Sequence, residues 1–357
     1  MPQQESELFE RARRYEGSGD LANAERTYLR YLRQFPGSAQ AHANLGVVYA
    51  HEGKLSEAIQ EYRNALKLSS SLSGVYLDLG IAYYRQGKFD AASNPLQRFL
   101  AREPSSTQAR TLLGLCYAQM DRHSDAVRML APLRARADPA VLLTLGASYV
   151  RLGRVQDAKP IFEELLAANR GSAQLHFLLG QTHIGLNQYV DALRELEDVR
   201  ALDPQWPHID YLLGGVEAKL GRFQEAEQHL QKELAGDPRS FETNFVLGTL
   251  LSKQARYREA IRFIREALKI NPHDSNALYQ LARAHWKTGS DRAALSESRA
   301  AVEYDPKNRP AHYLLAEIAK RTGDQGTARR EFSVAESLSH QESERDIFRL
   351  SAMGQKP

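Results

Sequence analysis

Hydrophobic and small residues recur along the chain with a step of 34 residues. The dipeptide Leu-Gly occurs at 45–46, 79–80, 113–114, 145–146, 179–180, 213–214 and 247–248, and Leu281-Ala282 and Leu315-Ala316 continue the series. An alanine ladder keeps the same step: Ala24, Ala58, Ala92, Ala126, Ala158, Ala192, Ala226, Ala260, Ala294 and Ala328. Both series shorten to 32 residues at the same place, before Leu145 and Ala158. Two ladders that share one step and one deletion indicate a tandem repeat.

Each repeat reads as a pair of helices. With Leu-Gly at positions 7 and 8, apolar residues at positions 4, 7, 8 and 11 share one face of a first helix, and those at 20, 24 and 27 share one face of a second. Glycine at position 15, as in Gly53, suits the positive φ that ends the first helix, and proline at position 32, as in Pro104, stops the second. The pattern predicts an all-α fold.

We expect ten such repeats over residues 5–340. They start at residues 5, 39, 73, 107, 139, 173, 207, 241, 275 and 309. One helix pair is too small to bury its own apolar face, so neighbouring pairs should stack into a right-handed superhelical solenoid. Residues 341–357 should form a capping helix and tail, with Ile347, Phe348 and Leu350 covering the last repeat.

The repeat resembles the tetratricopeptide repeat, whose pattern is W-x2-L-G-x2-Y…A-x3-F…P. Tyr49 and Tyr83 stand at position 11, whereas His42 and Tyr76 replace the tryptophan of position 4. The resemblance covers all ten repeats. It implies a protein-binding array whose first helices line a concave groove, with positions 2, 5, 9, 12 and 13 facing the ligand.

The fourth repeat, residues 107–138, breaks the regularity. It is two residues short, and the loss falls near the end of its second helix, around Ala137-Asp138. Proline also interrupts the second helices of repeats three to five. Pro95 and Pro160 lie near the first turn and should be tolerated, whereas Pro132 lies further along and should kink its helix. The irregularity is either a local bend that absorbs sequence drift or a hinge.

Composition bears on the partners and the compartment of the protein, but it does not alter the predicted fold. The 47 Lys and Arg residues exceed the 44 Asp and Glu residues by a net charge of only +3, which does not by itself indicate nucleic acid. No apolar run is long enough to span a membrane, and the amino terminus has no leader pattern. We therefore expect a soluble protein, cytoplasmic as written and extracytoplasmic if a leader has been removed. Its oligomeric state is left open.

Motifs for catalysis, cofactors and metals do not occur. The chain has no phosphate-binding glycine loop, dinucleotide fingerprint or H-E-x-x-H motif. His176 and His183 lie seven residues apart on one helix, but a core histidine is favoured over a zinc ligand there. The single cysteine, Cys116, falls on a buried position and lacks an activating neighbour. The sequence predicts no enzyme activity, no cofactor and no metal site.

The groove positions carry the candidate binding residues. Position 5 is aromatic in the last five repeats: Phe177, Tyr211, Phe245, Tyr279 and Tyr313. Position 13 is basic in the last four repeats: Lys219, Lys253, Lys287 and Arg321. Arg283 and Trp286 add a base and an aromatic ring in the ninth repeat. Tyrosine and lysine are also common at these positions in the family, but repeats two to five carry Ala43, Leu77, Thr111 and Leu143 at position 5. The aromatic run is therefore not obligatory for packing.

These features predict a non-catalytic interaction scaffold. Its groove should bind an extended protein or peptide segment, rich in acidic and apolar residues at the C-terminal end of the array. Asn44 alone matches the family's clamp for chaperone tails, so that partner class is disfavoured. Two alternatives stay open: a single-stranded RNA reader, in which bases stack on aromatic rings, and a scaffold subunit of a cell-envelope or export complex.

Overall fold

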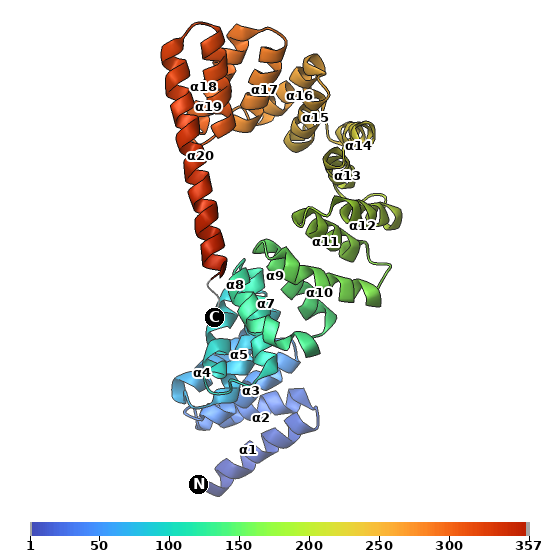
Figure 1. Cartoon of the computed structure of the whole chain (residues 1–357). Coiled ribbons are helices and arrows are strands. Elements are labelled where there is room, and N and C mark those ends of the chain that lie inside the picture. The colour runs from blue at the N-terminus through green and yellow to red at the C-terminus, as the bar shows by residue number, and fades with distance from the viewer. Residues whose placement is uncertain (1, 355–357) are drawn as a thin grey trace. The chain divides into compact units, whose positions relative to one another are not determined.

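The computed structural model describes the backbone of residues 2–354 and the side chains of residues 6–340. This part of the chain contains twenty α-helices, one 3-10 helix and no strand. Consecutive helices pack in pairs, as Figure 1 shows. The all-helical repeat fold predicted from the sequence is confirmed. The helices form two compact units, an N-terminal unit of residues 1–186 and a C-terminal unit of residues 187–357.

The N-terminal unit contains five helix pairs and the first helix of the sixth repeat. Its helices are α1 (Pro2–Gly17), α2 (Leu21–Gln34), α3 (Ala39–His51), α4 (Leu55–Leu68), α5 (Ser73–Arg85), α6 (Phe89–Leu100), α7 (Thr107–Gln119), α8 (His123–Leu130), η1 (Ala131–Arg136), α9 (Pro139–Arg151), α10 (Val155–Ala168) and α11 (Ala173–Gly185). The first helices α1, α3, α5, α7 and α9 contact one another in turn, so their groove positions share one surface.

The C-terminal unit repeats the arrangement. Its helices are α12 (Tyr189–Leu202), α13 (Ile209–Lys219), α14 (Phe223–Gly236), α15 (Phe241–Lys253), α16 (Tyr257–Ile270), α17 (Ser275–Lys287), α18 (Asp291–Tyr304), α19 (Arg309–Arg321) and α20 (Gln325–Gly354). The first helices α13, α15, α17 and α19 form a continuous row. Residues 341–354 continue α20, and the side chains of Ile347, Phe348 and Leu350 lie outside the described residues. Their capping role stays a prediction.

The start of most first helices is fixed by the last residue of the preceding repeat. A serine, aspartate or asparagine there accepts a hydrogen bond from the backbone N–H three residues later, which satisfies one of the free donors of the first turn. These capping residues are Ser38, Ser106, Asp138, Ser172, Ser240, Asp274 and Asn308. Seven of the repeat boundaries therefore specify the start of the next helix.

The turn inside each repeat requires a left-handed residue at position 15. Seven repeats use glycine there, with φ between 70° and 89°. The fourth, sixth and eighth repeats place Asp121, Asn187 and Ala255 in the same conformation, with φ from 56° to 59°. Asparagine and aspartate tolerate this region, whereas alanine does so at a cost of roughly 1 kcal/mol. The backbone of the turn is thus kept even where glycine is absent.

In repeats two to eight, the close packing of the two helices uses glycine at position 8. A Cβ atom added at Gly46 would lie 2.6 Å from the ring of Tyr62, which is position 24 of the same repeat. At Gly248 the added atom would lie 2.5 Å from Ile264 Cγ1 and 3.2 Å from the carbonyl oxygen of Ala260. The large side chain of the second helix therefore occupies the space that a side chain at position 8 would need.

The second helix of the fourth repeat is broken. Helix α8 ends at Leu130, and the six residues of η1, which include Pro132, continue as a 3-10 helix with no buried residue. Proline has no N–H to donate and its ring crowds the preceding turn, so the α-helix does not continue through it. In contrast, α6 and α10 run on through Pro95 and Pro160. The interruption expected at Pro132 takes the form of a change in helix type.

We expect amide hydrogen exchange to be faster over residues 129–139 than over α3–α4 or α15–α16. The 3-10 helix has poorer hydrogen-bond geometry and contributes no buried side chain, so its local opening should cost less free energy. Exchange read by mass spectrometry on the intact chain measures the difference. Equal protection along the array would refute the hinge hypothesis for this repeat.

Candidate peptide-binding surface

Four of the predicted aromatic residues lie along the row of first helices in the C-terminal unit. Tyr211, Phe245 and Tyr279, on α13, α15 and α17, are half-buried, and their rings pack against the core clusters of their repeats. Tyr313 on α19 is 56% exposed, and its ring meets Phe332 edge-on at 5.5 Å. Because adjacent first helices are in contact, these rings form one strip, which we call the aromatic strip. Phe177, the fifth predicted residue, is half-buried on α11 in the N-terminal unit.

The basic residues at position 13 differ in how available they are. Lys219, Lys253 and Lys287 are exposed, and none forms an ion pair within the described part of the chain. Arg321 is also exposed, but its guanidinium pairs with Asp291 and lies over the ring of Trp286 at 5.1 Å. Its charge is partly neutralised. Three ammonium groups without an ion-pair partner among the described residues thus remain for a ligand, where the sequence suggested four cations.

Five of the predicted residues meet in one pocket of about 920 Å³ at the end of the row. Tyr279, Arg283, Trp286 and Lys287 from α17 and Tyr313 from α19 line it together. The second helix α20 supplies a wall that includes Phe332 and Glu336. We call this the C-terminal pocket. The family's groove positions lie on first helices only and do not reveal this wall, for which the large residue at position 24, Phe332, is the available signal in the sequence.

Cations surround the indole of Trp286. The ammonium of Lys287 lies 4.9 Å from the ring centroid, and the guanidinium of Arg321 lies 5.1 Å from it. The indole Nε1 is buried without a hydrogen bond among the described residues. Packing and cation–π contact therefore hold the ring, rather than a polar partner. This fixes a rigid aromatic surface next to positive charge.

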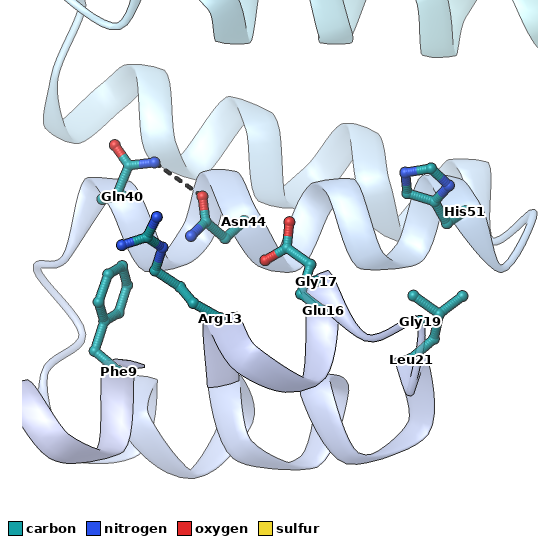
Figure 2. Close-up of a pocket in the computed structure, with 9 residues that line it drawn as sticks. All are labelled: Phe9, Arg13, Glu16, Gly17, Gly19, Leu21, Gln40, Asn44 and His51. Carbon is teal, nitrogen blue, oxygen red and sulfur yellow. Dashed lines mark hydrogen bonds between the residues drawn. The ribbon is translucent and has the colours of Figure 1, made fainter. Parts of the chain in front are cut away.

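A second pocket, of about 850 Å³, lies between α1 and α3 in the N-terminal unit. Figure 2 shows Phe9, Arg13 and Glu16 from α1 and Gln40 and Asn44 from α3 around it. The amide of Gln40 donates to Asn44 Oδ1 at 2.8 Å, as the dashed line in Figure 2 marks. This end of the groove is polar, unlike the C-terminal pocket.

The buried hydroxyl of Tyr28 forms hydrogen bonds with two residues of this second pocket. It donates to Glu16 Oε2 at 2.6 Å and accepts from Asn44 Nδ2 at 3.0 Å. Burial, followed by the hydrogen bond to Glu16, holds the pKa of the Tyr28 phenol well above its usual range. Glu16 and Asn44 are therefore both fixed by the core, which the sequence pattern did not reveal.

Asp78, at position 6 of the third repeat, carries an unusual acid–base property. Its side chain is half-buried on α5, and this burial raises the pKa of the carboxyl to about 6. The unfolded chain should have the ordinary value near ~3.9. Because the folded pKa lies above the unfolded one, the carboxylate costs stability above pH ~6. That stability returns as the pH falls and is complete below the unfolded pKa.

We expect Asp78→Asn to raise the free energy of unfolding at pH 7 by about 1–3 kcal/mol. The amide keeps the shape of the side chain but has no charge to desolvate. The gain should shrink as the pH is lowered and vanish near pH 4, where Asp78 is protonated in the folded chain. Denaturant titrations of both proteins at several pH values measure it. A variant less stable than the wild type at pH 7 would show that the charge has a partner that stabilises it.

Among the described residues, no helix is both long and apolar enough to cross a membrane. Profiles of the tetratricopeptide repeat match residues 9–72, 77–139, 149–215 and 251–318. No curated protein sequence matches the chain closely enough to count as a relative. The sequence comparison therefore points to a repeat family and to no individual relative.

Solved structures are similar to all or part of the chain. A chain of the APC/C hetero-tetramer Cut9–Hcn1 is similar over 94% of this chain and 87% of its own, with 13% identity and a TM-score of 0.53. A chain of Naa15/Naa10 bound to HypK-THB has 18% identity and a TM-score of 0.48 over 94% of this chain, which spans 64% of it. MamA from Desulfovibrio magneticus RS-1 has 25% identity over 47% of this chain and 96% of its own, with a TM-score of 0.44. The profile matches extend over most of the sequence, and the chain belongs to the tetratricopeptide repeat family.

Proposed function

We propose that the protein is an interaction scaffold that holds an extended acidic and apolar segment of a partner protein on the C-terminal unit. Tetratricopeptide repeat proteins are generally non-catalytic scaffolds, and membership of that family supports a scaffold role for this chain. The observation that carries the finer proposal is the C-terminal pocket, in which Tyr279, Arg283, Trp286, Lys287 and Tyr313 line one cavity.

The two kinds of side chain would contribute differently to binding. The rings of the aromatic strip are already packed on one side, so a partner side chain can cover the other side with little loss of conformational entropy. Such aromatic anchors commonly dominate the binding energy. Lys219, Lys253 and Lys287 are exposed, so they would mainly attract acidic partners and set the salt sensitivity.

Acidic side chains in the C-terminal pocket limit the classes of ligand that it can bind. Glu317 and Glu336 line the C-terminal pocket beside the basic residues. A polyphosphate backbone would meet these carboxylates, whereas a peptide can place carboxylates near Arg283 and Lys287 and neutral side chains near the glutamates. This mixture favours a peptide over a nucleic acid.

Binding of short synthetic peptides to the intact chain tests the proposal. We expect peptides that combine aspartate or glutamate with leucine or phenylalanine to bind, and matched peptides with lysine in place of the acids not to bind. Fluorescence anisotropy at low and at physiological salt measures the affinities, with oligouridine as the competing ligand class. Binding of oligouridine with a steep log–log dependence on salt, and of no acidic peptide, would favour the RNA alternative.

A further inference from the structure

The broken second helix of the fourth repeat leaves one apolar side chain out of the core. Position 27 is buried wherever it is apolar in the other repeats, as in Phe99, Leu165 and Val199. Leu133, at position 27 of the fourth repeat, is only partly buried. It follows Pro132 in η1, and a 3-10 helix turns about 120° per residue instead of about 100°. Leu133 lies three residues beyond Leu130, where the α-helix ends. Its side chain is therefore rotated by roughly 60° from the direction that it would have in an α-helix.

The displaced leucine lines a pocket of about 820 Å³ in the N-terminal unit. Ile81 and Tyr84 from α5, Leu112 from α7 and Pro132 from η1 contribute its apolar walls. We call this the seam pocket. It lies at the groove positions of the third and fourth repeats, and Pro132 and Leu133 of η1 form part of its wall.

The charged rim of the seam pocket is positive. Arg85 and Arg136 both line it and are exposed. Arg136 has no ion-pair partner in the described part of the chain, and Arg85 donates to the carbonyl oxygen of Ala50 at 3.2 Å. The one acidic residue of the lining, Asp138, accepts the backbone N–H of Val141 at 3.0 Å as the cap of α9. Its carboxylate keeps its charge, so the two arginines exceed the one acid and the lining has a net charge of +1.

We infer that the seam pocket is a second docking site, which takes one large apolar side chain of a partner protein with a carboxylate next to it. The apolar side chain would cover Leu133, Leu112 and Ile81 and remove their surfaces from water. The neighbouring carboxylate would bind the guanidinium of Arg136, with Arg85 nearby, because arginine forks match carboxylate geometry. This site lies in a different unit from the C-terminal pocket, so it does not rest on the function proposed there.

A peptide selection on the full chain tests the inference. The bait carries Tyr279→Ala and Tyr313→Ala, which remove the two rings of the aromatic strip that line the C-terminal pocket, and the probe is a random peptide library displayed on phage. We expect enriched peptides to contain a large apolar residue within two positions of aspartate or glutamate. Because the bait lacks the two tyrosines on which the function proposed for the C-terminal unit depends, failure here is separate from failure of that function.

Substitutions then locate the bound peptide. Leu133→Asp should weaken the selected peptide by at least ~10-fold, and Arg136→Glu should weaken it by several fold. Leu68→Asp, at a leucine that is 48% exposed on α4, is the matched control and should leave the affinity unchanged. The peptide should also slow hydrogen exchange over residues 129–139. Arg136 is exposed and unpaired, so its variant reports on binding even if Leu133→Asp unfolds. No enriched peptide, or one that binds the Arg136 and Leu133 variants as tightly as the parent, overturns the inference.

Discussion

Replacing Tyr279 and Tyr313 together by alanine is expected to weaken binding of an acidic and apolar peptide by at least ~30-fold, the effect of losing about 2 kcal/mol at one hot spot. Both rings line the C-terminal pocket, and Tyr313 is 56% exposed in the absence of a ligand. A peptide side chain that packs between them would lose contact with both. The affinity of the peptide for the variant and for the wild type, measured by anisotropy, checks the result.

Stability separates a binding role from a structural one. The two tyrosines are only partly packed, so the double variant should unfold at nearly the same denaturant concentration as the wild type. Leu247→Ala is the matched structural control: Leu247 is fully buried on α15, and its truncation should lower the free energy of unfolding by about 2–5 kcal/mol. A double variant that is destabilised like Leu247→Ala would assign the rings to the core. One that remains folded and binds normally would place the binding surface elsewhere.

The substitution Gly248→Ala is expected to lower the free energy of unfolding by about 1–3 kcal/mol, although alanine favours helix formation over glycine. The new Cβ would lie 2.5 Å from Ile264 Cγ1, and the backbone oxygen of Ala260 at 3.2 Å leaves no room on the other side. The methyl group can be accommodated only if Ile264 leaves its position or the two helices separate. Denaturant unfolding of the intact chain measures the cost.

In a chain that already carries Ile264→Ala, Gly248→Ala should no longer lower the free energy of unfolding. Removing Cγ1 creates the space that the alanine methyl needs, so Gly248→Ala in that background should be neutral or stabilise the chain by up to ~1 kcal/mol through helix propensity. The ninth repeat already combines small residues at the two equivalent positions, with Ala282 and Ser298 both buried. Equal destabilisation in both backgrounds would mean that the backbone atoms of α16, and not the side chain of Ile264, limit the residue at 248.

The regular features of the fold could be predicted because the same sequence pattern recurs in each repeat. Helix pairs, the left-handed turn and the small residue at position 8 follow from local patterns, and the turn persists even where Ala255 replaces glycine. The site was predictable only in part. The aromatic strip lies on the expected helix face, but the pairing of Arg321 with Asp291 joins residues about one repeat apart and depends on side-chain positions that periodicity does not encode.

Other contacts join a second helix to first helices, and the pattern of either helix alone does not predict them. The hydrogen bonds of Tyr28 to Glu16 and Asn44 join α2 to two first helices, and no motif marks them. The wall that Phe332 and Glu336 provide was missed for the same reason, since it comes from a second helix. At Pro132 the sequence predicted an interruption but not its form, because a kink and a 3-10 helix both remove the same hydrogen bond.

The 3-10 helix of the fourth repeat also changes how far the chain travels. The regular second helix α4 has 14 residues and is followed by four linking residues, whereas the fourth repeat has eight α-helical residues, six in η1 and only Ala137 and Asp138 as a link. A residue rises ~2.0 Å in a 3-10 helix and ~1.5 Å in an α-helix, so η1 gains about 3 Å over six residues. That is close to the reach of one extended residue. Roughly half of the two-residue deletion is therefore recovered as length along the helix, so the repeat that is shortest in sequence is not proportionally shortest in space.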